Sequence, residues 1–171
     1  LIQADISSEE GIVNLKEILD ARNIKIDILI NNAAIDFVSE LEEKTEETFL
    51  KVFKLNTLGP FSMIKYFGLE IEEKNGVILN ISSDNAIDQY DVVTMEYDVS
   101  KAGLNIMTKS FAKHFKNSRV NAIAFGWLDT PMNDIPDNIK ETMPFVPLEI
   151  AVDKIIDLIH SEKTGEIEIV R

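Results

Sequence analysis

The feature that most constrains the fold is a regular alternation of continuous apolar runs with amphipathic helical patterns. The apolar runs predict strands at 1–5, 26–34, 76–83, 119–125 and 165–171. Between them, helical periodicity predicts helices at 7–23, 45–73, 94–115 and 147–163. Strands that are apolar on both faces are typical of a parallel sheet covered by helices on both sides. The sequence therefore predicts an α/β fold, a doubly wound parallel sheet.

Length and composition narrow the class of protein further. The chain has 171 residues, of which 45% are apolar, so we expect residues 1–171 to form a single packed domain. The net charge of −13 argues against nucleic acid or an anionic membrane as a partner. No apolar run reaches the roughly 18 residues of a membrane helix. The absence of cysteine excludes thiolate metal sites and fits the cytoplasm, and we expect no metal.

Two local signals refine the helices. Ser7 and Glu10 have the spacing of a capping box at the start of the 7–23 helix. Gly59 and Pro60 interrupt the 45–73 pattern, where we expect a kink or a close contact.

Polar or small residues follow three of the strands. "NNAA" occupies 31–34, Ser83 ends the next strand, and "FGWLDTPM" occupies 125–132. In parallel sheets, ligands bind beyond the carboxyl ends of the strands. The sequence therefore predicts a site at this edge.

Tyr97 and Lys101 are the first candidates for chemistry. Their i,i+4 spacing places both on one face of the 94–115 helix. A neighbouring ammonium stabilises a phenolate and lowers its pKa, which would suit Tyr97 to acid–base catalysis. The alternative is two ordinary residues on a solvated helix, since this spacing is common by chance.

Ser83 and Asn56 each allow a functional and a structural interpretation. The Ser83 hydroxyl could hold a substrate oxygen beside Tyr97, or it could simply cap or turn the chain. Asn56 lies inside a helical pattern that it does not favour, which suggests a local break that could hold a water. The alternative for Asn56 is a solvated helical position.

Small residues at two strand ends could approach a flat ligand. Ala33 and Ala34 would allow close contact with the backbone, and Asn32 could bind a carbonyl or hydroxyl. Gly126 permits a sharp turn, and Thr130 offers a hydroxyl and an amide. Both segments could also be plain turns that lead out of strands.

In combination, these motifs resemble those of the classical short-chain dehydrogenases/reductases, over essentially the whole chain. The matching features are "NNAA" at 31–34, Asn56, Ser83, the Tyr97–Lys101 pair, the "FGWLDT" stretch at 125–130, "ADIS" at 4–7 and "TGEI" at 164–167. The resemblance implies a Rossmann-like sheet and hydride transfer between NAD or NADP and a small-molecule carbonyl or alcohol.

The resemblance also implies a role for each matching residue. Tyr97 would be the proton donor or acceptor, Lys101 would lower its pKa and bind the nicotinamide ribose, Ser83 would orient the substrate oxygen, and Asn56 would hold a water. The cofactor would be contacted by Asp5, Ile6, Asn32, Ala33, Ala34, Tyr97, Lys101, Gly126, Leu128 and Thr130.

The chain departs from the family pattern at several positions. Phe125 replaces a proline and Ala34 replaces a glycine. The segment between Ser83 and Tyr97 is unusually acidic, and its carboxylates would repel an anionic substrate if they faced the cleft. A solvated acidic loop is the alternative that we expect.

The glycine-rich turn that cradles the pyrophosphate in this family does not occur in the chain. The resemblance implies that roughly 50–60 residues, two βα units, precede Leu1. In the usual strand order these units lie between the strand at 1–5 and the strand at 26–34. We therefore expect 1–5 to lack a sheet neighbour and 26–34 to form an exposed apolar edge.

Two hypotheses follow. The first is an NAD(P)-dependent oxidoreductase of carbonyls and alcohols. The second is a catalytically impaired remnant that acts as a binding or oligomerisation module. In the family the helices at 45–73 and 94–115 pair between subunits, so we expect a homodimer or homotetramer, although packing in the protein's own core explains most of the same apolar residues.

Overall fold

The computed structural model describes residues 1–132 and 142–171. Its four strands form one parallel sheet in the order β1-β2-β3-β4. The strands are β1 (Ile28–Asn31), β2 (Val77–Ser83), β3 (Arg119–Phe125) and β4 (Ile167–Val170). The main helices are α1 (Glu9–Ala21), α2 (Glu46–Phe53), α3 (Gly59–Glu73), α4 (Met95–His114) and α6 (Leu148–His160). The predicted α/β fold with a parallel sheet is confirmed.

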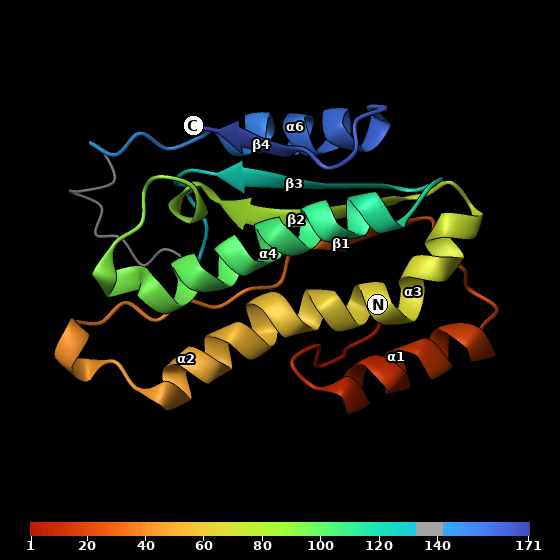
Figure 1. Ribbon diagram of the computed structural model, residues 1–171, viewed down its shortest axis with the longest axis horizontal. Helices are drawn as coiled ribbons and strands as arrows, with labels where there is room; N and C mark the ends of the chain where they lie inside the picture. Colours follow the sequence, from red (N-terminus) through yellow and green to blue (C-terminus); the bar gives the residue numbers. More distant parts are fainter. Residues whose placement is uncertain (133–141) are drawn as a thin grey trace.

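Helices cover both faces of this sheet (Figure 1), which explains the continuous apolar strands. On one face, Ile78 and Val120 pack with residues of α1 and α3. On the other, Leu79 and Ile123 pack with residues of α6. Neighbouring residues of a strand thus supply two separate cores.

The prediction of a strand at 1–5 is wrong. This segment forms no strand, because no strand in the described part of the chain lies beside it. The expectation that it would lack a sheet neighbour is confirmed, as is the apolar edge at β1. Ile28 and Ile30 of β1 are 47% and 42% exposed, on the face that α6 covers elsewhere.

Local signals set the helix boundaries. The cap of α1 is Ser8 rather than Ser7, since the Ser8 hydroxyl accepts from Gly11 N at 3.1 Å. The expected irregularity near Gly59 and Pro60 is a π-helical turn, η2 (Lys54–Leu58), between α2 and α3, in which Asn56 and Thr57 are buried. The core-packing explanation holds for several of the apolar residues of these helices and α4: Val52, Ile64, Phe67 and Leu104 are buried.

Within residues 1–132 and 142–171, no helix combines the length and apolarity required to cross a bilayer.

Glu72, in the last turn of α3, fixes the turn that leads into β3. Its carboxylate accepts hydrogen bonds from the backbone N–H groups of Lys116 at 2.7 Å, Asn117 at 2.9 Å and Ser118 at 2.7 Å, and from the Ser118 hydroxyl. Partial burial alone would raise the Glu72 pKa, but these hydrogen bonds outweigh it and lower the pKa to about 2. The ionised form is therefore the one that stabilises the fold.

We expect Glu72→Gln to lower the free energy of unfolding by about 2 kcal/mol at pH 7, since charge-assisted hydrogen bonds are lost. Because the folded pKa is depressed, this contribution is present above the unfolded value near 4.5 and is lost as pH falls toward 2. Urea unfolding between pH 7 and pH 3 measures it. The adjacent exposed Glu73, changed to Gln, is the control, and equal losses in both variants would contradict the assignment.

Candidate active site

A cavity of about 890 Å³ opens at the carboxyl ends of β1, β2 and β3. Most of the site residues predicted from the sequence line it. They are Asn32, Ala33, Ala34, Ser83, Tyr97, Lys101, Gly126, Leu128 and Thr130. Residues 133–141, inside the loop at 126–146 that we expect to shape a substrate pocket, lie outside the described part of the chain.

Three of the predicted site residues do not line this cavity. Asn56 is buried within η2. The Asp5 carboxylate accepts from Ser7, from its backbone N–H at 2.9 Å and its hydroxyl at 2.7 Å. Ile6 lies against Gly59, the first residue of α3, where its carbonyl oxygen is 3.0 Å from the place that a Cβ atom would occupy. The cofactor contacts expected of Asp5 and Ile6 stay predictions.

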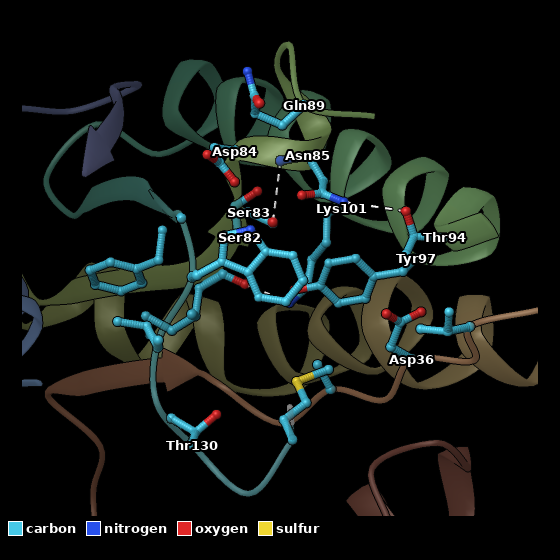
Figure 2. A pocket seen from close by; sticks show the side chains of 18 of the residues that line it. Asp36, Ser82, Ser83, Asp84, Asn85, Gln89, Thr94, Tyr97, Lys101 and Thr130 are labelled. Atoms are coloured by element: carbon cyan, nitrogen blue, oxygen red, sulfur yellow. Dashed lines mark hydrogen bonds between the residues drawn. The ribbon is translucent and has the colours of Figure 1, made fainter. Parts of the chain in front are cut away.

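Tyr97 and Lys101 face the cavity together from α4 (Figure 2). The helical spacing places the Lys101 ammonium 5.4 Å from the centroid of the Tyr97 ring. Lys101 is buried, and its Nζ donates to the Ile81 carbonyl oxygen of β2 at 2.7 Å. The pair is therefore part of the cavity wall and does not belong to a solvated helix face.

The net fall expected for the Tyr97 pKa is wrong for this arrangement, whereas the role of Lys101 in stabilising a phenolate stays a prediction. Burial raises the pKa of Tyr97 to about 12; a hydrogen bond with Ser83 opposes the rise, and the charges of Asp36, Asp98 and Asp84 add to it. Burial also lowers the pKa of Lys101 to about 8. The low-dielectric surroundings disfavour both charged forms, so Tyr97 is a neutral phenol at neutral pH.

Ser83 has the structural role that the sequence allowed, while its role in holding a substrate oxygen stays a prediction. It is buried at the end of β2, and its hydroxyl caps the short helix η3 (Asp84–Ala86) by accepting from Asn85 N at 3.3 Å. The same hydroxyl interacts with the Tyr97 phenol. Two oxygens thus face the same point in the cavity.

Asn56 is not a solvated helical residue, since it is only 1% exposed. Its amide oxygen accepts from Ile35 N at 2.9 Å, and its amide nitrogen donates to Ile35 O at 2.8 Å and to the Ser100 hydroxyl at 3.0 Å. The predicted break in the helix is confirmed as η2. Because these bonds occupy the side-chain amide, Asn56 fixes the segment that follows β1, and its role in holding a water stays a prediction.

The expectation of a solvated acidic segment is wrong for two of its members, Asp84 and Glu96, and Asp98, just after Tyr97, is buried as well. Asp84 is buried and pairs with Arg171 Nε at 3.1 Å. Glu96 is buried and pairs with Lys44 at 2.5 Å. Asp98 accepts from Asn85 at 2.9 Å and from the backbone N–H of Asp91 at 2.9 Å.

Sequence reasoning missed Asp36, whose carboxyl points toward the space beside the Tyr97 ring (Figure 2). Its Oδ1 atom is buried and accepts from no group in the described part of the chain. Burial raises the pKa of Asp36 to about 6; the Phe37 N–H and Lys44 oppose the rise, while Asp98 and Glu96 add to it. The only signal in the sequence was its position two residues after "NNAA", which is too common to indicate a site.

We expect Asp36→Asn to stabilise the protein by about 1–2 kcal/mol at pH 7, because it removes a buried charge. A carboxyl whose folded pKa is raised costs stability as pH rises from about 4 through 6, so the gain should disappear near pH 4. Thermal unfolding at both pH values measures it. An equal or lower melting temperature of the variant at pH 7 would contradict the assigned cost.

Comparison of the sequence with known proteins finds reductases and dehydrogenases. The family model described as enoyl-(acyl carrier protein) reductase matches residues 1–157. The chain is 38% identical over 122 residues to the 3-oxoacyl-(acyl-carrier-protein) reductase FabG of Thermotoga maritima, which covers 69% of this chain and 49% of that protein. It is 34% identical over 139 residues to 3beta-hydroxysteroid dehydrogenase 1 of Eggerthella lenta, covering 77% and 52%. The chain thus spans about half the length of the curated relatives it matches.

Solved structures of similar fold include complexes with NADH and with NADP. A 4-hydroxyisoleucine dehydrogenase complexed with NADH and succinate superposes with a TM-score of 0.88 at 28% identity, covering 99% of this chain and 76% of that one. The Pseudomonas aeruginosa RhlG/NADP active-site complex superposes with a TM-score of 0.89 at 25% identity, covering 99% and 74%. With the family model matching nearly the whole chain and the Ser83, Tyr97 and Lys101 side chains around one cavity, the chain belongs to the short-chain dehydrogenase/reductase family.

Proposed function

We propose that this protein is an NAD(P)-dependent oxidoreductase that acts on a small-molecule carbonyl or alcohol, with Tyr97 as general acid and base. The observation that carries the proposal is the convergence of Ser83, Tyr97 and Lys101 on one cavity at the carboxyl ends of the strands. The names of the relatives support an enzyme over a binding or oligomerisation module, since each is a reductase or a dehydrogenase.

The residues around the cavity fit the nicotinamide end of a dinucleotide. Ala33 and Gly126 present little side-chain bulk, which allows a flat ring to approach the backbone, and Thr130 and Asn32 add polar groups. The Lys101 ammonium is a donor suited to ribose hydroxyls. When bound, the cofactor supplies or accepts the hydride, which no protein side chain can do. The neighbours bound to NADH and to NADP support either nucleotide.

The side chains supply position and a proton. The Ser83 hydroxyl would hold the substrate oxygen next to the Tyr97 phenol. A phenol with a pKa near 12 is protonated at neutral pH, so it can donate a proton to that oxygen as a carbonyl is reduced. In the oxidation of an alcohol the phenolate must first form, and the buried ammonium of Lys101 is the cation that can stabilise it.

We further propose a homodimer or homotetramer in the cytoplasm, without nucleic acid or membrane as a partner. The outer surfaces of α3 and α4 carry large apolar residues, among them Leu69 at 69% and Ile106 at 67% exposed. Such exposed side chains support pairing of these helices between subunits. The net charge of −13 and the lack of cysteine support the remaining assignments.

We expect Tyr97→Phe to reduce kcat by at least about a hundredfold, because the general acid is lost. The cofactor should still raise the melting temperature of the variant, since the phenol ring is retained; at 100 times Kd the stabilisation is about 2.7 kcal/mol. The control is Tyr90→Phe, because Tyr90 is 73% exposed. If the Tyr97 variant reduced a carbonyl at the original rate, the assigned proton donor would be refuted. If neither NADH nor NADPH raised the melting temperature of the unmodified protein, the assigned cofactor would be refuted.

We expect Ile106→Glu to lower the oligomeric state by placing a charge in the proposed α3–α4 contact between subunits. Light scattering coupled to size exclusion measures the mass. The control is Ile156→Glu on α6, where Ile156 is 46% exposed on the opposite side of the sheet. An unchanged mass of the Ile106 variant, in a sample shown to be oligomeric, would place the interface elsewhere.

A further inference from the structure

Asp36 lies in a loop whose backbone is fixed by hydrogen bonds to a buried side chain. The preceding residue, Ile35, exchanges two hydrogen bonds with the buried Asn56 side chain, at 2.9 and 2.8 Å. Asn56 is in turn bonded to Ser100 of α4. The backbone that carries Asp36 is therefore fixed beside Tyr97, as a residue that recognises a ligand requires.

The other acids that line the cavity have partners, whereas one oxygen of Asp36 has none. Asp84 is paired with Arg171, and Asp91 accepts from Val93 N at 3.1 Å. Asp36 Oδ1 is buried and receives no hydrogen bond from residues 1–132 or 142–171. A buried carboxylate oxygen without a donor is costly, so this position calls for a donor from outside the described residues.

The Lys44 ammonium, the cation that acts on Asp36, already has other hydrogen-bond partners. Lys44 is in electrostatic reach of Asp36, but its ammonium is bonded to Glu96 at 2.5 Å and to Val93 O at 3.1 Å. Lys101, on the other side of Tyr97, donates to Ile81 O. Glu96 and Asp98 add negative charge around Asp36. The surroundings thus favour a neutral or cationic donor and disfavour an anion.

We propose that Asp36 is a specificity-determining residue that accepts a hydrogen bond from a hydroxyl or ammonium group carried by the substrate near its reacting carbonyl. Hydroxylated or aminated carbonyl compounds are then preferred over their alkyl analogues, and carboxylates are rejected. This inference rests on the proposed function, because it assigns the substrate class of the same cavity.

The test compares ligands that differ only in the donor group. One series is butanone, hydroxyacetone and aminoacetone; a second, one carbon longer, is 2-pentanone, 4-hydroxy-2-butanone and 4-amino-2-butanone. Pyruvate represents the carboxylates. Dissociation constants are measured by NMR titration for the unmodified protein, Asp36→Asn, Asp36→Leu and Asp88→Asn. Asp88 is the control, since its exposed carboxylate is not part of the cavity lining, although its partner Arg171 is.

In at least one series we expect the unmodified protein and Asp88→Asn to bind a donor ligand about tenfold to a hundredfold more tightly than its alkyl analogue, the range of a hydrogen bond to a charged group. Asp36→Leu should abolish the preference. Asp36→Asn should retain part of it for a hydroxyl ligand and lose most of it for an ammonium ligand, which distinguishes the two donors.

The proposal is overturned if neither series shows a preference for the donor ligand, if pyruvate binds as tightly as the donor ligands, or if the preference survives in Asp36→Leu. Turnover is measured separately as consumption of NADH and NADPH. A protein that binds donors through Asp36 but turns over none of the ketones would contradict the oxidoreductase function and leave the recognition role of Asp36 supported.

Discussion

The hydrogen bonds of the Asn56 side chain connect the three parts of the chain that meet at the cavity. Asn56 sits in the π turn between α2 and α3, binds both backbone groups of Ile35, and donates to Ser100, whose hydroxyl donates to the Tyr97 carbonyl at 2.7 Å. The exit of β1, the long α2–α3 segment and the turn of α4 that carries Tyr97 are thereby fixed to one another. Because Asn56 and Ser100 are buried, removing one of them would leave buried polar atoms unpaired.

The same burial sets the electrostatics of the cavity. Low polarisability around Tyr97, Lys101 and Asp36 opposes the charged form of each, which raises the pKa of the two acids and lowers that of the ammonium. The groups that the fold needs in ionised form have partners instead, such as Asp84 with Arg171 and Glu96 with Lys44. The groups whose pKa is shifted chiefly by burial, Tyr97, Lys101 and Asp36, are thus concentrated where the chemistry is proposed.

The sheet determines which strand ends meet. The parallel register pairs Asn31 with Asn80 and Ser83 with Phe125, so "NNAA", Ser83 and Gly126 emerge at the same edge. A buried chain of hydrogen bonds, from Asn31 to Asn80 and from Asn80 to Thr108, joins β1 and β2 to α4 at 2.8 Å each. These side-chain bonds fix the helix that carries Tyr97 to the strand beneath it.

The sequence by itself determined the alternation of strands and helices, since apolar periodicity is a local property, and it predicted that "NNAA", Ser83 and the "FGWLDT" stretch would share one edge of a parallel sheet. Tyr97 and Lys101 were placed on one helix face, and only the family resemblance brought them to that edge. The motif spacing was sufficient to indicate the family. Other features depended on contacts between distant segments. The segment at 1–5 has strand-like composition but pairs with no strand in the described part of the chain. The acidic run before Tyr97 has the composition of a solvated loop, but two of its members, Asp84 and Glu96, are buried and paired. Only the tertiary structure decided the direction of the Tyr97 pKa shift and the exposure of Asp36 to the cavity, because desolvation and long-range charge depend on which atoms surround a group, and i,i+4 spacing carries no information about them.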